Sequence, residues 1–242
     1  MFNFLVNFFD ITLYRPLFNA LILIYNYLPL RDFGLSIILL TVVIRFILYP
    51  LSIKALNSQK ALQKLQPALK EIQKKYKDDK EKQAKETLEL YKNEKINPFS
   101  GLLLVIIQFP ILIALYRVFS SGLKPEELSK LYNFVTNPIT INPLFLHMVD
   151  LSKPNLWFAV AAGIFQFFQT KMLMPKTEKG KSDNDMAAMM QKQMIYFFPF
   201  VTVLILLRLP SALGLYWIVS GIFSVIQQYL ILKPKKSEIK KV

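Results

Sequence analysis

One arginine, Arg45, stands where a charge is costly and where the sequence supplies no obvious partner. It lies inside SIILLTVVIRFILYPLS, a run with no other charge. An arginine near the centre of a membrane helix costs about 2.5–3.5 kcal/mol on insertion scales, and its guanidinium does not release its proton. All 16 Asp and Glu residues fall outside the long apolar runs of the chain. Arg45 is therefore a cationic site whose counter-ion has to come from elsewhere.

Polar, uncharged side chains inside the apolar runs are the groups that would surround such a charge. They are Thr41, Gln108, Gln166, Gln169, Thr202, Ser220, Ser224, Gln227 and Gln228. Each one alone is typical of an interhelical hydrogen bond that only aids packing. Together with an unpaired arginine they favour a hydrated cavity in a helical bundle. Two alternatives are a closed anion pore and a side chain that reaches the headgroups. The latter fits poorly, because about eight residues, or ~12 Å, separate Arg45 from the nearer end of its run.

The sequence gives no support for bond-making chemistry. It contains no Cys, and its single histidine, His147, has no metal-ligand spacing around it and reads as an interfacial loop residue. Thiolate catalysis, disulfides and Cys-ligated metals are therefore excluded. Neither G-x-x-x-x-G-K nor G-x-G-x-x-G occurs, so nothing suggests coupling to ATP or NAD. We expect neither an enzyme nor a cofactor or metal.

Composition indicates a membrane protein, because 53% of the 242 residues are hydrophobic and only 19% are charged. A bilayer core of ~30 Å needs about 20 helical residues. The long runs predict five membrane spans, at residues 32–53, 98–120, 154–174, 192–208 and 211–232. The fourth is short at ~22 Å, which predicts local thinning of the bilayer unless Met190 or Leu209 extends it. Within residues 1–31, the 15-residue stretch Pro16 to Leu30 is a sixth candidate span, but its length and its two asparagines favour an amphipathic helix lying in the extracytoplasmic interface.

The net charge of +14 is distributed unevenly. Segments 54–97, 171–192 and 233–242 hold 22 of the 30 Lys and Arg residues. By the positive-inside rule these segments are cytoplasmic, including loop 175–191 and the basic tail. Loop 121–153 and the N-terminus are then extracytoplasmic, and the C-terminus is cytoplasmic.

The cytoplasmic segment 54–97 predicts a helical hairpin. Apolar residues recur at steps of three and four on both sides of Asp78 and Asp79, as expected for two arms with a narrow seam; they are Leu62, Leu65, Leu69, Ile72, Tyr76, Ala84, Leu88 and Tyr91. Pro67 should bend the first arm. A solvated basic helix pair with no partner is the plain alternative. The excess of Lys in the hairpin and in the tail KPKKSEIKKV favours binding to an anionic partner.

Several unusual segments occur in an order and spacing that resemble those of a known family. They are TVVIRFILYPLS, QKLQPALKEIQKKY, YKNEKINP, IQFPILIALY, HMVDLS and LPSALGLYWIVSGIFSVIQQYLI. Over about residues 16–234 the chain resembles the YidC/Oxa/Alb family of membrane protein insertases, in the bacterial form that lacks the large periplasmic domain.

The resemblance implies an all-α membrane protein with five transmembrane helices around a hydrophilic groove, an interfacial N-terminal helix and a cytoplasmic helical hairpin. The groove would receive the short acidic extracytoplasmic tail of a nascent inner-membrane protein, without nucleotide hydrolysis. Arg45 and Thr41 match groove positions, and Gln108, Gln166, Gln169, Ser220, Ser224 and Gln227 complete the expected lining. Tyr216 and Trp217 match an aromatic pair that contacts substrate. Asp150 matches an acidic residue in the outer loop of the family, and no role for it follows from the sequence.

The resemblance also implies partners beyond the substrate and the lipid bilayer. The hairpin and tail match regions that contact ribosomes and targeting factors, and we expect Lys74, Lys75, Lys77, Lys235 and Lys236 to make these contacts. The Sec translocon is a further candidate partner. A small anion channel or transporter is the alternative function, since it too would explain Arg45. It predicts internal repeats, and the sequence contains no pair of matching halves.

Overall fold

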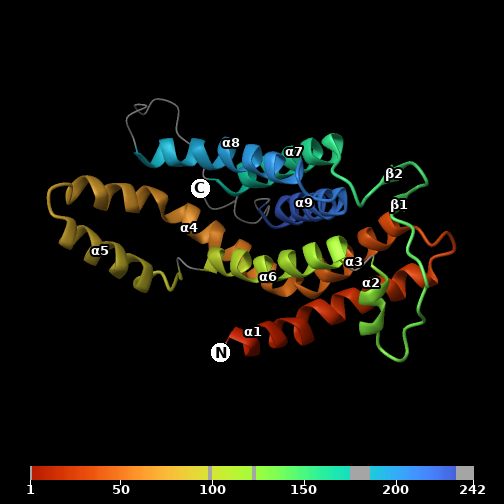
Figure 1. The fold of residues 1–242 in the computed structure, drawn as a ribbon. Coiled ribbons are helices and arrows are strands. Elements are labelled where there is room, and N and C mark those ends of the chain that lie inside the picture. Colours follow the sequence, from red (N-terminus) through yellow and green to blue (C-terminus); the bar gives the residue numbers. More distant parts are fainter. Residues whose placement is uncertain (1, 98–99, 122–123, 175–185, 233–242) are drawn as a thin grey trace.

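The chain is almost entirely helical in the computed structural model, which describes residues 2–97, 100–121, 124–174 and 186–232 (Figure 1). Helix α1 (Phe2–Phe9), the π-helical turn η1 (Asp10–Tyr14) and α2 (Arg15–Tyr27) follow one another without a break in helical backbone. Pro16 is tolerated because it lies in the first turn of α2, where its missing N–H interrupts little. The helix therefore begins well before the expected Pro16.

The first predicted span is a bent pair of helices. Helix α3 (Phe33–Ile47) begins at Asp32, whose side chain accepts a hydrogen bond from the N–H of Leu35. Helix α4 (Tyr49–Lys75) follows at an angle of 61°. Pro50 accounts for the bend, because it has no N–H to bond the carbonyl of Phe46 and its ring clashes with the preceding turn. We expected one helix over residues 32–53, whereas in the structure the helix axis changes direction at Leu48.

Helices α4 and α5 (Lys80–Asn93) run side by side away from the bundle (Figure 1). Asp79 accepts a hydrogen bond from the N–H of Lys82 at 3.0 Å and so begins α5 directly after the Asp78-Asp79 turn. Helix α4 continues through Pro67. Leu88 is exposed, although its spacing placed it in the seam. Hydrogen bonds between the arms lie near the turn, from Tyr76 to Glu86 and from Gln83 to the carbonyl of Gln73.

The remaining helices are α6 (Ser100–Ser121), α7 (Leu156–Leu173), α8 (Met186–Leu206) and α9 (Ser211–Leu232). Between α6 and α7 lie the 3-10 helix η2 (Pro125–Lys130) and a two-stranded antiparallel sheet of β1 (Leu144–Phe145) and β2 (Val149–Asp150). The sheet lies at the end of the bundle opposite the α4–α5 hairpin (Figure 1). Helix α9 contacts α3, α4, α6, α7 and α8, so it is the central element.

Three helices among the described residues are long and apolar enough to cross a membrane: Phe4–Tyr27, Leu156–Leu173 and Ser211–Ile231. The bent α3–α4 pair raises the number to four if it counts as one span. Ile106–Ser121 and Gln193–Leu206 are shorter apolar helices. The chain is thus a multi-pass helical protein, and the five crossings that we expected are taken up below as a proposal.

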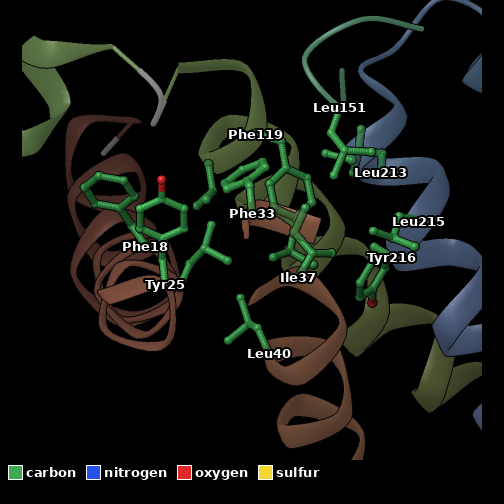
Figure 2. Packing of buried hydrophobic residues seen from close by; sticks show 14 of the residues in the cluster. Phe18, Tyr25, Phe33, Ile37, Leu40, Phe119, Leu151, Leu213, Leu215 and Tyr216 are labelled. Carbon is green, nitrogen blue, oxygen red and sulfur yellow. The ribbon is translucent and has the colours of Figure 1, made fainter. Parts of the chain in front are cut away.

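The buried apolar core joins the N-terminal helix to the bundle (Figure 2). Phe18 and Tyr25 of α2 face Phe33 and Ile37 of α3, and Phe33 meets Phe119 of α6 edge to face, with ring centroids 6.2 Å apart. On the other side of this core, side chains from the start of α9 pack with Leu151 of the outer loop. The core therefore lies at the end of the bundle that carries the outer loop.

Helix α7 packs very closely on α8 and α9. A Cβ on Gly163 of α7 would lie 2.5 Å from Val203, and a Cβ on Gly221 of α9 would lie 2.8 Å from Phe165. Both distances are below any real Cβ contact, so the backbones approach only because these residues lack a side chain. Close approach through small residues is the main source of helix association in lipid.

Candidate functional site

Arg45, Gln108 and Tyr216 meet inside the bundle. Arg45 lies 13 residues after Asp32, at the end of α3 next to the β1–β2 sheet, and Gln108 lies 13 residues before Ser121, at the corresponding end of α6. Both are therefore about 20 Å from those ends. Tyr216, which is 2% exposed, accepts a hydrogen bond on its hydroxyl from Nε2 of Gln108. Arg45 lies within electrostatic range of the Tyr216 side chain and makes no hydrogen bond to it.

Arg45 has no anionic partner among the residues that the structure describes. It makes no salt bridge and no hydrogen bond within that part of the chain. It lies in the last turn of α3, two residues before the helix ends at Ile47. A cation is favoured near the negative end of a helix dipole. The structure therefore leaves the half-buried Arg45 without an anionic partner among the described residues.

A polar face runs along α9 below Tyr216. Ser220, Ser224 and Gln227 follow it at steps of four, four and three and are all buried. Oγ of Ser220, Nε2 of Gln227 and Oε1 of Gln228 have no hydrogen-bond partner among the residues that the structure describes. An unpaired buried polar atom costs about 1–3 kcal/mol unless water or a ligand satisfies it. These atoms therefore favour a hydrated face.

Of the other predicted groove residues, Gln166 is hydrogen-bonded to another helix and Thr41 only within its own. Nε1 of Trp217 donates to Oε1 of Gln166 at 2.6 Å, which ties α9 to α7. Thr41 is buried and donates to the carbonyl of Ile37 in its own helix at 2.6 Å. Gln169 lies one turn beyond Gln166 on α7, half-buried. The structure thus assembles two polar pairs around α9.

The predicted ribosome contacts lie at the far end of the α4–α5 hairpin. Lys74, Lys75 and Lys77 are exposed there, and Nζ of Lys75 lies 5.2 Å from the ring centroid of Tyr76. Lys235 and Lys236 lie outside the described residues.

A cluster of charged groups that sequence reasoning did not single out ties the N-terminal helix to α6 and η2. Arg117 lies 3.3 Å from the carboxylate of Asp10 and 4.4 Å from the ring centroid of Tyr14. The buried Tyr14 donates to Glu127, which also pairs with Lys130 at 2.9 Å. Burial alone would raise the pKa of Glu127, but the hydrogen bonds from Lys130 and Tyr14 outweigh it and lower that pKa.

Three further side chains of α2 bind the outer loop. Asn19 accepts a hydrogen bond from the N–H of Tyr132 at 2.6 Å, and Asn26 donates to the carbonyl of Thr136 at 2.6 Å. The hydroxyl of Tyr25 accepts one from the N–H of Asn142 at 3.1 Å. In the sequence both asparagines read only as interruptions of an apolar helix, and no local signal identified their partners.

Asp150 stabilises the turn that begins α9. Its carboxylate accepts hydrogen bonds from the hydroxyl and N–H of Ser152, at 2.5 and 3.0 Å, and lies 3.0 Å from Nζ of Lys153. The hydroxyl of Ser152 and the ammonium of Lys153 lower the pKa of Asp150. The carbonyl of Lys153 then accepts from the N–H of Ser211 at 2.9 Å. Asp150 therefore shapes the loop that caps α9.

The chain is similar to a known family of proteins. The sequence model of the family described as 60Kd inner membrane protein matches residues 23–238. The chain belongs to this family. Its members are inner-membrane proteins by that description, and the apolar helices of this chain fit that location.

Relatives in the family carry a common name. The chain is 38% identical over 202 residues to the membrane protein insertase YidC of Fusobacterium nucleatum, covering 84% of this chain and 87% of the relative. It is 34% identical to the YidC of Oceanobacillus iheyensis, covering 84% and 76%. In Francisella philomiragia the matching YidC is longer: the chain is 31% identical and spans 34% of that relative.

One solved structure is also similar to the chain described here. It is described as an active YidC insertase crystal structure with the first transmembrane domain resolved. The superposition has a TM-score of 0.57 at 28% identity, and it covers 92% of this chain and 47% of that one.

Proposed function

We propose that this chain is a membrane protein insertase that receives the acidic extracytoplasmic tail of a nascent inner-membrane protein beside Arg45. The observation that carries the proposal is an arginine that makes no salt bridge in the described part of the bundle and lies within electrostatic range of Tyr216, the partner of Gln108. The names of the relatives support the same function. Insertion makes and breaks no covalent bond, so the protein needs no catalytic residue and no nucleotide.

The polar face of α9 supports a physical mechanism. A peptide tail in hydrocarbon loses several kcal/mol for each backbone group left unsatisfied. A groove with water held by Ser220, Gln227 and Gln228 would satisfy those groups over part of the membrane. Arg45 would then attract the acids of the tail, and the tail would leave the groove as the following helix enters lipid.

We further propose five crossings, by α3, α6, α7, α8 and α9, with the α4–α5 hairpin in the cytoplasm. The N-terminal helix also has the length of a span. Its polar contacts argue against a sixth crossing, since from Asp10 to Asn26 the cross-chain contacts go to Arg117 or to residues 127–142. A crossing helix would change sides over those ~24 Å. An interfacial position satisfies all these contacts at the outer side.

Single cysteines should report this topology cleanly because the chain has no native Cys. A membrane-impermeant maleimide should label Ser129→Cys and Ser152→Cys from outside, since both positions are exposed on the outer loop. It should reach Ser58→Cys, as well as Ser182→Cys and Ser237→Cys outside the described residues, only from the cytoplasm. Asn19→Cys should be shielded, because Asn19 is buried. External labelling of Ser182→Cys would contradict the five-crossing arrangement.

The insertase function is tested by cross-linking to a stalled nascent membrane protein. A photoreactive residue in place of Gln166 or Ser220 should capture the translocated tail of the substrate. The matched controls are Ile164 and Ile222, which lie on α7 and α9 but are exposed on the outside of the bundle. Capture that is equal on both faces, or absent from both, would count against the groove. Ion flux through liposomes containing only this protein would favour the channel alternative.

The exposed lysines of the hairpin fit contact with the ribosome and with targeting factors, and the Sec translocon remains a further proposed partner. Ribosomal RNA is a polyanion, and Lys74, Lys75 and Lys77 lie together at the hairpin tip, where a large particle reaches them without touching the bilayer.

A further inference from the structure

The carboxylate of Asp32 joins two parts of the chain that lie 114 residues apart. Asp32 is 4% exposed. Its Oδ1 accepts a hydrogen bond from the N–H of Leu35 at 2.8 Å, which caps α3. Its Oδ2 accepts one from the N–H of Leu146 at 2.5 Å, in the turn between β1 and β2. A helix cap needs only one of the two oxygens. The bond from Leu146 to Oδ2 is therefore not required for capping and has a separate effect.

The turn that Asp32 binds has an unfavourable backbone. Leu146 and His147 have φ angles of 50° and 60°, and the N–H of Met148 donates to the carbonyl of Phe145 at 2.9 Å. Leu146 and His147 are thus the two central residues of a β-turn closed by that bond, and a turn with positive φ at both of them normally carries Gly, Asn or Asp there. Bulky residues keep such angles only where their surroundings fix them. The bond from Leu146 to Asp32 is one contact that fixes them.

The β1–β2 hairpin also touches α3 and α9. The ring of Phe145 lies directly on the backbone of α3, because a Cβ on Gly34 would lie 2.1 Å from ring atom Cδ2. After β2, the carbonyl of the fully buried Leu151 accepts a hydrogen bond from the N–H of Ala212 in the first turn of α9 at 3.1 Å. The hairpin therefore bridges the outer ends of the two helices that carry Arg45 and Tyr216.

We propose that Asp32 is a positioning residue: through the β1–β2 hairpin it fixes α3 against α9 and so holds Arg45 beside Tyr216. A slip of α3 by one residue would move Arg45 by about 1.5 Å along the helix and 100° around it, which would turn the guanidinium away from the polar face. The effect on insertion rests on the proposed function, whereas the link between the helices does not.

The variant that separates the two bonds of Asp32 is Asp32→Ser. Serine is a good helix cap, but its short side chain does not reach Leu146. The matched control is Asn155→Ala, which removes the cap of α7 on the same side of the bundle and leaves the hairpin bonds in place. Hydrogen exchange of the full chain in nanodiscs, read by mass spectrometry, reports both. Exchange in residues 144–151 and 211–215 should become about 10-fold faster in Asp32→Ser and stay unchanged in Asn155→Ala.

A second substitution tests the role of the turn. Leu146→Gly removes the unfavourable φ, so it should restore slow exchange in residues 211–215 when added to Asp32→Ser. Insertion of a substrate with an acidic tail should fall several-fold in Asp32→Ser and recover in the double variant. A plain loss of helix capping would not be rescued in this way.

The outcomes separate the two proposals. Faster exchange confined to residues 33–36 would overturn the positioning role, because Asp32 would then only cap α3. Faster exchange in α9 with unchanged insertion would overturn it as well. A wild-type protein that inserts no substrate would contradict the proposed function instead, and the exchange result would stand independently of it.

Discussion

Replacing Arg45 by alanine should abolish insertion of substrates whose translocated tail carries Asp or Glu, while substrates with neutral tails should insert almost as well as with the wild type. The reason is that Arg45 is uncompensated within the described part of the bundle, so its charge acts on whatever anion enters. Arg45→Lys should retain much of the activity, since the need is for charge at that depth. Arg45→Glu should repel acidic tails.

The size of the effect follows from Coulomb's law in a wet groove. At an effective dielectric constant of about 20, a charge pair at ~4 Å contributes up to ~4 kcal/mol, so the coupling between Arg45 and a tail acid should be ~1–4 kcal/mol. A double-mutant cycle of Arg45→Ala and Asp→Asn in the tail measures it. Arg208→Ala, which removes an exposed arginine, is the control. Equal loss for acidic and neutral tails would show that Arg45 hydrates or orders the groove instead.

Reversing the charges of Lys74, Lys75 and Lys77 to Glu should weaken binding to translating ribosomes and flatten its dependence on salt. Each lysine that neutralises an RNA phosphate releases about one counterion, so losing three contacts should reduce the log–log salt slope by about 2–3. Between 50 and 200 mM salt, the ribosome affinity of the wild type should therefore fall roughly 40-fold more than that of the variant. Sedimentation with stalled ribosomes at several salt concentrations measures it.

A matched charge reversal on the other side of the bundle controls for net charge. Arg31, Lys124 and Arg208 are exposed at the outer end, so their replacement by Glu changes the net charge equally but should leave ribosome affinity unchanged. An affinity of the wild type that does not respond to salt would mean that the lysines act only as topology signals.

The sequence was most informative where the determinant is local. Helix α9 begins at Ser211 and ends at Leu232, the bounds of the predicted run, because Pro210 precedes it and its residues are uncharged throughout. The turn at Asp78 and Asp79 was predicted from the apolar periodicity on either side of it, and in the structure Asp79 caps α5. The membership of the family was also predicted correctly, from motifs that are specific in order and spacing.

The sequence was least informative where the determinant is a distant contact or a change of direction. Counting uncharged residues placed Arg45 about eight residues from the end of its helix, whereas Pro50 turns the helix at Leu48. The bond from Gln108 to Tyr216 joins residues 108 apart, and no periodicity reveals such a pair. Asp32 could have been recognised as a cap, but its second partner could not.

The close approach of α7 to α9 at Gly221, together with the hairpin at the start of α9, limits how the bundle can deform. Because α7 packs this closely on α9, with Cβ of Phe165 against Gly221, we expect the two helices to move as one lever whose pivot is the first turn of α9. A rotation of about 5° would shift Tyr216, five residues from the pivot, by under ~1 Å, and Gln227, sixteen residues away, by about 2 Å. Such a rotation would therefore widen the end of the bundle that lies next to the α4–α5 hairpin, while the surroundings of Tyr216 would stay nearly constant.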